Sequence, residues 1–227
     1  MREALAADAP SDIVDAVFAI SCRSLPVDHA YALSQAIQGA LPWFAAEPGA
    51  GLHTIHGAAS GGGWLRPEGE HAVLQLSRRA RLALRLPRRR LDDAAAMIGR
   101  TLQVADQPLR VDRLSVRPLS RITTLFSRSV MLADRNDAAA DDEAAFLAAA
   151  TRELGALGID TARMLCGRVT PLATPARNYR TRSLMLAGLA PAHALALQQL
   201  GLGAGRMLGC GLFIPHKDIA DLRTRLD

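Results

Sequence analysis

The sequence has very little lysine, few cysteines and no long apolar segment. Lys217 is the only lysine, although the 227-residue chain carries 27 basic residues. No apolar run reaches the roughly 18 residues of a transmembrane helix, and the first ten residues lack the hydrophobic segment of a signal peptide. We therefore expect a cytoplasmic protein that makes no contact with a membrane.

Patterns typical of metal sites are also missing. Cys22, Cys166 and Cys210 are odd in number and have no Cys-x-x-Cys spacing, which argues against a disulfide framework and against a zinc site. We expect these cysteines to be small buried apolar residues. Carboxylates are not clustered as in a metal-dependent nuclease, and the acidic residues between Asp134 and Glu143 have the composition of a solvated loop. The sequence thus predicts neither a metal ion nor a cofactor.

Positive charge is present in moderate excess and is concentrated in one segment. The net charge is +5 and the isoelectric point is about 9.8, a balance that favours a polyanionic partner. The arginines that gather between positions 78 and 90 are Arg78, Arg79, Arg81, Arg85, Arg88, Arg89 and Arg90. One region of the chain should therefore be cationic.

Segment 201–213 is rich in glycine. Glycine reaches positive φ angles without a Cβ clash and leaves its N–H group accessible, so such a loop can lie against phosphate. The spacing matches neither a Walker loop nor the dinucleotide-binding fingerprint. The glycines are Gly201, Gly203, Gly205, Gly209 and Gly211. The alternative is a glycine-rich connection from a helix to a strand that binds no ligand.

Hydrophobic periodicity predicts alternating strands and helices in the first half of the chain. The expected strands are 13–22, 53–60, 72–87 and one or two between 101 and 116, and the expected helices are 25–41 and 91–99. Asp28 is a candidate N-cap of the first helix. Within 72–87, Arg81, Ala83 and Arg85 alternate with leucines, which predicts a strand with one basic face.

The second half repeats this order. The expected strands are 123–132, 164–169, 180–186 and 212–215, and the expected helices are 143–157 and 190–200, with an acidic loop before the first helix and a loop over 170–179. Two βαββαβ units in tandem make an α+β, double ferredoxin-like fold. We place an N-terminal domain at 10–120 and a C-terminal domain, which contains the glycine-rich loop, at 121–227.

A double ferredoxin-like chain with a glycine-rich loop before its last strand resembles the RAMP superfamily of CRISPR systems, and in particular the Cas6 family. The motifs that carry the resemblance are the glycine-rich segment 201–213 and Leu-Pro-Val-Asp-His-Ala-Tyr-Ala-Leu at 25–33. Together with the repeated topology, the likeness spans 13–215. Gly-Leu-His-Thr-Ile-His-Gly at 51–57 is most similar to the myxobacterial-type variant of the family.

The resemblance implies an activity and its partners. The activity is metal-independent cleavage within the repeat of a CRISPR precursor RNA by attack of a 2′-hydroxyl on the adjacent phosphate, which leaves a 2′,3′-cyclic phosphate and a 5′-hydroxyl. The implied partners are a repeat RNA with a stem-loop and other subunits of a CRISPR effector complex, because family members often stay on their product. The sequence does not specify an oligomeric state.

Histidines are the candidates for proton transfer in such a reaction, because their pKa lies near neutrality. His56 comes first, since the glycines between 57 and 63 would let RNA approach. His53 comes second. In a strand, residues three positions apart face opposite sides, so only one of His53 and His56 is expected to reach the phosphate. His29 comes third, at a helix start whose dipole lowers the pKa, although in the family this histidine is often structural.

Arginines are the candidates for binding RNA, because their planar guanidinium bonds phosphate and stacks on bases. The first group is Arg78, Arg79, Arg81, Arg88, Arg89 and Arg90; the second is Arg177, Arg180 and Arg182 around Tyr179; and Arg206 would add charge to the five glycines of the loop. Each group has an alternative as solvated surface. Since no lysine lies near the expected site, Arg23 is the candidate that stabilises the phosphorane.

Two other functions stay open at this point. One is a non-catalytic RNA-binding RAMP subunit that holds guide RNA in an effector complex. The other is a general RNA-binding or ribosome-assembly protein, although the aromatic ribonucleoprotein motif of an ordinary RNA-recognition module is absent. Cleavage of a repeat RNA separates the endoribonuclease from both.

Overall fold

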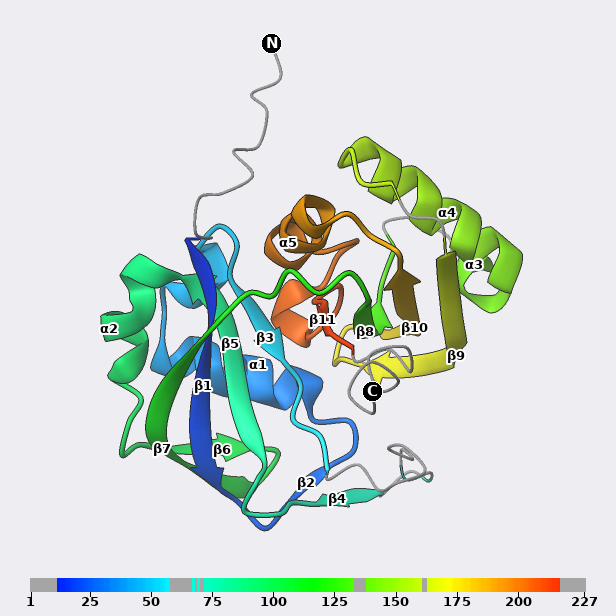
Figure 1. Ribbon diagram of the computed structural model, residues 1–227. Helices are drawn as coiled ribbons and strands as arrows, with labels where there is room; N and C mark the ends of the chain where they lie inside the picture. The colour runs from blue at the N-terminus through cyan, green and yellow to red at the C-terminus, as the bar shows by residue number, and fades with distance from the viewer. Residues whose placement is uncertain are drawn as a thin grey trace, which may run out of the picture.

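A computed structural model describes residues 12–57, 67, 69, 72–132, 138–160 and 163–216 (Figure 1). The first half contains β1 (Ile13–Ser21), β2 (Ser24–Pro26), α1 (Ala30–Ala40), β3 (Gly51–His53), β4 (Val73–Gln75), β5 (Arg81–Pro87), α2 (Leu91–Ala95), β6 (Thr101–Val104) and β7 (Gln107–Pro118). The second half contains β8 (Leu125–Val130), α3 (Ala138–Asp141), α4 (Glu143–Ala156), β9 (Arg163–Ala173), β10 (Asn178–Ala187), α5 (Pro191–Leu200) and β11 (Ile214–Pro215). Short 3-10 turns occupy Phe44–Ala46, Arg88–Arg90 and Arg206–Leu208.

Both halves contain an antiparallel sheet with the same strand order. The first sheet has the order β3-β5-β1-β7-β6, and the second has the order β11-β8-β10-β9. Without β6, the four strands of each half follow the order 4-1-3-2 when they are numbered along the chain. Helices α1 and α2 connect the strands of one half, and α4 and α5 those of the other (Figure 1). This is the tandem ferredoxin-like fold predicted from the sequence, and the prediction is confirmed.

The two faces of the first sheet differ in character. Even-numbered residues of β1, from Val14 to Ile20, are buried in a core with Leu33 and Ile37 of α1. Each buried valine, leucine, isoleucine or phenylalanine side chain contributes about 1.5–3 kcal/mol. Odd-numbered residues, from Asp15 to Ala19, point to the opposite face because side chains alternate along a strand. We call this the helix-free face of the first sheet, since the two helices of the first half, α1 and α2, both lie on the other side.

The second half has its own core. Phe146 and Leu154 of α4 and Leu197 of α5 are almost completely buried against Leu184 and Leu186 of β10. The expected boundaries of the two domains, 10–120 and 121–227, stay a prediction, because they concern how each half would fold alone. None of the helices in the described ranges has the length and apolar character to span a membrane.

A buried arginine joins the two halves. Arg85 of β5 is fully buried, and its Nε and Nη2 atoms donate to the two carboxylate oxygens of Asp15 at 2.8 and 3.0 Å. Its Nη1 donates to the main-chain oxygens of Gln198 and Phe213 in the second half, at 2.8 and 2.9 Å. Arg85 lies on the face of the strand that was predicted to be basic, but its side chain is buried because the second half of the chain partly covers this face.

The start of the first helix differs from the prediction. Residues Ser24–Pro26 form β2, which pairs with β4, and α1 begins only at Ala30. A residue before proline is biased towards extended backbone, which opposes a helix at Leu25. Asp28 is not the N-cap; its carboxylate accepts the N–H of Ala173 at 3.0 Å and so connects α1 with the end of β9.

Other boundaries also moved. The predicted strand 72–87 is two strands, with a turn closed by the bond from the Ala80 N–H to the Ser77 carbonyl at 2.9 Å. The predicted loop 170–179 is mostly strand, because β9 lies at the sheet edge, where a proline such as Pro171 is tolerated. Part of the predicted acidic loop is helix α3. Residues 58–60 of the predicted strand 53–60 and the glycines at 61–63 lie outside the described residues.

Candidate functional site

The candidate site lies where the two halves of the chain meet. A hollow of about 250 Å³, here called the central hollow, is lined from the first half by Asp28, His29, Thr54 and His56 and from the second by Phe126, Arg128, Arg168, Thr181 and Ser183, among others. Its walls therefore combine imidazole, guanidinium and hydroxyl groups. These are groups that can bind a phosphate and move protons.

A second hollow of about 240 Å³, the sheet hollow, lies over the helix-free face of the first sheet. Its lining includes Asp15, His53, Arg79, Arg81 and Arg117. Thr54, His56, Phe126 and Arg128 line both hollows. His56 and Arg128 thus stand at the boundary between the two hollows, one contributed by each half of the chain.

His56 follows β3 and is half-buried. Its Nε2 atom lies 3.1 Å from the hydroxyl oxygen of Thr54. Gly209 of the glycine-rich loop packs behind Thr54: a Cβ atom at position 209 would lie 2.7 Å from Thr54 Cγ2 and 3.4 Å from its main-chain nitrogen. The loop and Thr54 together therefore fix the orientation of the imidazole.

His53 is placed differently from His56. Its Nε2 atom is buried and lies 3.4 Å from Asp15 Oδ1, without the geometry of a hydrogen bond. Burial lowers the pKa of His53, so the ring is neutral at neutral pH. Burial alone would raise the pKa of Asp15, but the polar contacts with His53 and Arg85 and the charge of Arg85 hold it well below its usual range. His53 is thus part of a buried network that borders the sheet hollow.

His29 has both ring nitrogens engaged with the main chain. Its Nε2 accepts the N–H of Ile55 at 3.1 Å, so the proton must sit on Nδ1, which donates to the carbonyl oxygen of Pro26 at 2.8 Å. The side chain is buried although it borders the central hollow. This arrangement favours the structural alternative for His29, since proton transfer would require one of these bonds to break.

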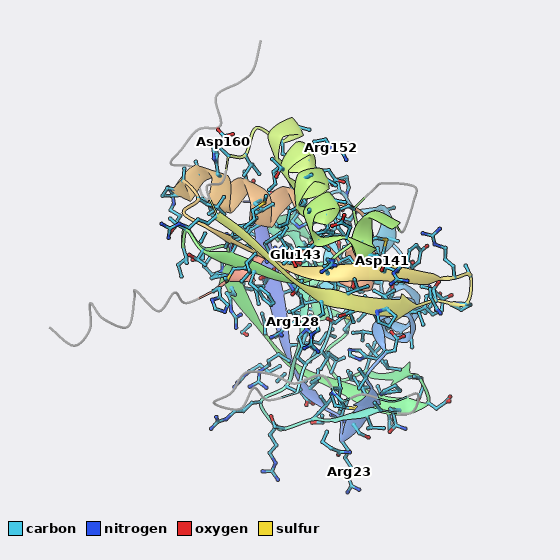
Figure 2. The ribbon with its side chains drawn as sticks, turned by 90° about the vertical axis from the view of Figure 1, so that its right-hand side faces the viewer. Arg23, Arg128, Asp141, Glu143, Arg152 and Asp160 are labelled. Carbon is cyan, nitrogen blue, oxygen red and sulfur yellow. The ribbon has the colours of Figure 1, made fainter. Side chains whose placement is uncertain are left out.

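Arg128, which the sequence analysis missed, lies closer to the histidines than Arg23 does. Figure 2 shows Arg128 between the β9–β10 hairpin and the strands of the first half, and Arg23 at the far end of the first half. Arg23 lines neither hollow that contains His56. Burial lowers the pKa of Arg128, but an arginine keeps its charge. The signal in the sequence was an arginine two residues after Phe126, within an otherwise uncharged strand.

The first arginine group is divided in space. Arg78, Arg79 and Arg81 lie at the start of β5, and segment 88–90 lies beyond its end, roughly 20 Å away for a strand of seven residues. Arg79 and Arg81 line the sheet hollow. At the other end, both Arg89 and Arg90 form ion pairs with Glu47, that of Arg90 at 2.6 Å. Of this group, the structure therefore brings only Arg79 and Arg81 into the lining of the candidate site.

The second arginine group also separates into different roles. Arg182 is buried and donates to the main-chain oxygens of Ala140, Gly167 and Asp141, at 2.6, 2.7 and 2.9 Å. These bonds hold α3 against the second sheet and favour a structural role, and a contact of Arg182 with RNA stays a prediction. Arg180 forms an ion pair with the Asp141 side chain. The exposed Arg177 stacks on Tyr179, with 4.4 Å from the guanidinium carbon to the ring centroid.

The glycine-rich loop packs tightly against protein. All five of its glycines have φ angles between 69° and 82°. A Cβ atom at Gly203 would lie 2.2 Å from the carbonyl oxygen of Met131, and one at Gly211 would lie 2.1 Å from that of Leu202. The N–H groups of residues 201, 202, 204 and 208–211 already donate to main-chain carbonyls. This packing accounts for the glycines, and a contact with RNA there stays a prediction.

Arg206 also stabilises the packing of the glycine-rich loop against the rest of the protein. Its Nε, Nη1 and Nη2 atoms donate to the carbonyl oxygens of Ala50, Leu200 and Gly49, at 3.0, 2.6 and 2.8 Å. Burial lowers the pKa of Arg206 to about 10, so it stays charged at neutral pH. These three bonds favour a structural role for Arg206. Among the described residues, no group of three or more His, Cys, Asp or Glu side chains is placed to hold a metal ion.

Comparisons with known proteins match this architecture. The family model Cas6 Crispr matches residues 14–218. This chain belongs to the Cas6 family. The CRISPR-associated endonuclease Cas6 of Myxococcus xanthus (strain DK1622) is 31% identical over 202 residues, which cover 89% of this chain and 81% of the relative. The resemblance that the sequence analysis drew from segments 25–33 and 201–213 is confirmed.

Solved structures of Cas6 and RAMP proteins share the fold. A structure of a Cas6-related gene product from Pyrococcus furiosus has a TM-score of 0.62 and 12% identity, and it covers 91% of this chain and 99% of its own. A RAMP protein described as binding different RNA substrates has a TM-score of 0.57 and 12% identity, over 90% of this chain and 99% of its own. At these identities the likeness concerns the fold alone.

Proposed function

We propose that this Cas6-family protein is the endoribonuclease that cleaves CRISPR precursor RNA within its repeats. The observation that carries the proposal is that His56 and Arg128, one from each half of the chain, line both hollows. A histidine and an arginine that both line two hollows with arginines in their walls suit a phosphate with RNA on both sides. The relative from Myxococcus xanthus, described as an endonuclease, supports the same reading.

The proposed reaction needs no metal ion. The 2′-oxygen of one nucleotide bonds to the adjacent phosphorus, the bond from phosphorus to the 5′-oxygen breaks, and a 2′,3′-cyclic phosphate and a 5′-hydroxyl result. The proton of the 2′-hydroxyl passes to a base, and the departing 5′-oxygen receives a proton from an acid. The positive charge of Arg128 would stabilise the negative charge that grows on the phosphorane.

The contact between His56 and Thr54 sets how the imidazole would act. If Nε2 carries the proton, it donates to the Thr54 hydroxyl oxygen, and Nδ1 is the atom that accepts the proton of the 2′-hydroxyl. If the ring is instead protonated on both nitrogens, Nε2 still donates to the Thr54 hydroxyl oxygen, and Nδ1 is the atom that gives its proton to the departing 5′-oxygen. In both cases Thr54 is a positioning residue, and the reacting atom of His56 is Nδ1.

The RNA would be bound mainly through its phosphates. Arg79, Arg81 and Arg117 around the sheet hollow and Arg168 in the central hollow place positive charge on both sides of His56. Arg177, stacked on Tyr179 at the tip of the β9–β10 hairpin, would add a contact by charge and stacking. We further propose that the protein stays on its stem-loop product, in contact with other effector subunits.

The test of this function is cleavage of a repeat RNA in excess EDTA, with end-group analysis of the products. A single cut in the repeat that leaves a 2′,3′-cyclic phosphate, and that disappears when the nucleotide before the cut is 2′-deoxy, is the expected result. Cleavage that requires added Mg²⁺ or Mn²⁺ would refute the metal-independent reaction. Tight binding with no cut under any condition would favour the guide-holding subunit instead.

A further inference from the structure

A third and larger hollow lies at the far end of the first sheet. This end hollow has a volume of about 760 Å³ and lies between the C-terminal end of β1, the β4–β5 turn and the β6–β7 hairpin. Its charged and hydroxyl-bearing lining residues include Ser21, Arg23, Ser77, Arg78, Arg110 and Asp112. Figure 2 shows the Arg23 side chain extending from this end of the molecule.

Positive charge predominates in the end hollow. Arg23 and Arg78 are exposed, and Arg110 donates from Nε to Asp112 Oδ1 at 3.1 Å. The other carboxylate oxygen of Asp112 accepts the hydroxyl of Ser21 at 2.8 Å. Among the described residues of the lining, Asp112 is the only acidic one, so three arginines face one carboxylate. The surplus of positive charge fits an anionic chain.

The end hollow and the sheet hollow have neighbouring lining residues. Ala19, which lines the end hollow, is the cross-strand partner of Arg81, which lines the sheet hollow. Neighbouring strands are about 4.8 Å apart. Arg78 of the end hollow is also adjacent in sequence to Arg79 of the sheet hollow. The arginines of the two hollows thus follow one another from the site of His56 to the end of the first sheet, and we call this series of arginines the cationic path.

We propose that this path holds a single-stranded segment of the RNA that flanks the cleavage site, with Arg23, Arg78 and Arg110 binding its phosphates. This inference rests on the proposed function. The path lies along one face of a sheet and turns around the β4–β5 connection, which suits a flexible strand better than a rigid duplex. In the part of the chain that the structure describes, no aromatic residue lines the end hollow, so bases are not stacked there and the binding is independent of sequence.

The test compares RNAs with and without flanking nucleotides. Each RNA carries a 2′-deoxy nucleotide at the cleavage position, so that it is bound without being cut, and flanks are removed separately on the 5′ and 3′ sides. For the variant Arg23→Ala/Arg78→Ala, we expect binding of the flanked RNA to weaken by on the order of tenfold to thirtyfold at about 0.1 M salt. The slope of log K against log salt should fall by about 1.4, since each phosphate contact of a single strand contributes about 0.7.

The same variant should bind the trimmed RNA as tightly as the wild-type protein does. Arg88→Ala is the matched control, because Arg88 is an exposed arginine beyond the other end of β5 and lines none of the three hollows. It should leave binding of both RNAs unchanged. Equal weakening for flanked and trimmed RNA, no weakening at all, or an effect of Arg88→Ala as large as that of the double variant would overturn the inference.

Failure of the inference can be told from failure of the proposed function. Cleavage is measured separately, with wild-type protein in excess over a repeat RNA that lacks the deoxy substitution, so that it does not depend on the binding comparison. A protein that shows the expected flank dependence but cuts no RNA would keep the binding path and refute the nuclease. A protein that cuts the repeat RNA but binds flanked and trimmed RNA equally tightly would keep the nuclease and refute the binding path.

Discussion

The Nε2 atom of His29 accepts a hydrogen bond from the main-chain N–H of Ile55, the residue before His56. The bond connects the start of α1 to the segment that carries the candidate catalytic side chain. We therefore infer that His29 positions the segment that carries His56, whereas a catalytic role of His29 stays a prediction.

Replacing His29 should affect stability and cleavage together. His29→Ala removes two buried hydrogen bonds, and we expect a loss of about 1–3 kcal/mol in the free energy of unfolding. Cleavage should slow because segment 54–56 is less well held, while the shape of its pH profile stays unchanged. His29→Gln, whose side-chain amide can still donate and accept hydrogen bonds, should restore part of the stability and part of the cleavage rate. A pH profile that loses one limb in His29→Ala would instead assign proton transfer to His29.

The buried pair of Asp15 and Arg85 should dominate stability at the junction of the halves. Arg85→Leu leaves the Asp15 carboxylate buried without its cation, and we expect a loss of about 3–5 kcal/mol in urea unfolding at neutral pH. The double variant Asp15→Leu/Arg85→Leu should lose less than the single one, because it leaves no uncompensated charge. A double variant less stable than Arg85→Leu would contradict this account of the pair.

The ion pair of Asp15 and Arg85 also predicts that the stability of the folded protein depends on pH. The pKa of Asp15 is lower in the folded protein than in the unfolded chain, so its contribution to stability is fully present above the unfolded value of about 3.9. That contribution is lost progressively as the pH falls below about 4. Wild-type stability should therefore fall over this range more steeply than that of the double variant, as measured by urea unfolding at several pH values.

Gly209 offers a test of how the glycine-rich loop supports the site. Gly209→Ala places a Cβ against Thr54 at a φ of 82°, so we expect both a lower melting temperature and a displaced His56. Gly99→Ala is the matched control, since Gly99 has a φ of 83° and a Cβ atom added there would point into open space. Both variants should be destabilised, but only Gly209→Ala should slow single-turnover cleavage. Equal cleavage rates would show that the loop does not position Thr54.

Two arginines of the β9–β10 hairpin, Arg177 and Arg182, should differ in function: one should contribute to RNA binding and the other to stability. Arg177→Ala removes an exposed side chain stacked on Tyr179, and we expect weaker RNA binding with an unchanged melting temperature. Arg182→Ala removes a buried side chain that bonds three carbonyls, and we expect a lower melting temperature instead. Melting curves and binding titrations of the two variants measure both effects. A stable Arg182→Ala that binds RNA weakly would return Arg182 to the RNA interface.

Much of the fold could be predicted because it depends on local patterns. Strand β1, helix α4 and the order of the elements follow from hydrophobic periodicity and from stop signals such as Gly158. The roles of the arginines could not be predicted in this way. Arg85 and Arg81 stand four residues apart in one strand and on one face, yet one is buried under the second half of the chain and the other is exposed. Their difference arises only from how the halves pack.

The candidate site was predictable only in part, because its residues come from both halves of the chain. His56 followed from the chemistry that the resemblance requires, and its place beside a hollow agrees with that choice. Arg128 comes from the other half of the chain, 72 positions later in the sequence, and no local pattern relates the two residues. The glycines pointed to a close approach of the main chain, but the partner proved to be protein.

Single-turnover cleavage by His56→Ala tests the central claim most directly. The protein should be in excess over a repeat RNA, with EDTA present, beside wild-type protein and His53→Ala, and binding of the RNA should be measured separately. The account predicts that His56→Ala binds the RNA nearly as tightly as wild-type protein but cuts it at least about a hundredfold more slowly, the scale of general acid–base catalysis. Cleavage by His56→Ala at the wild-type rate would contradict it.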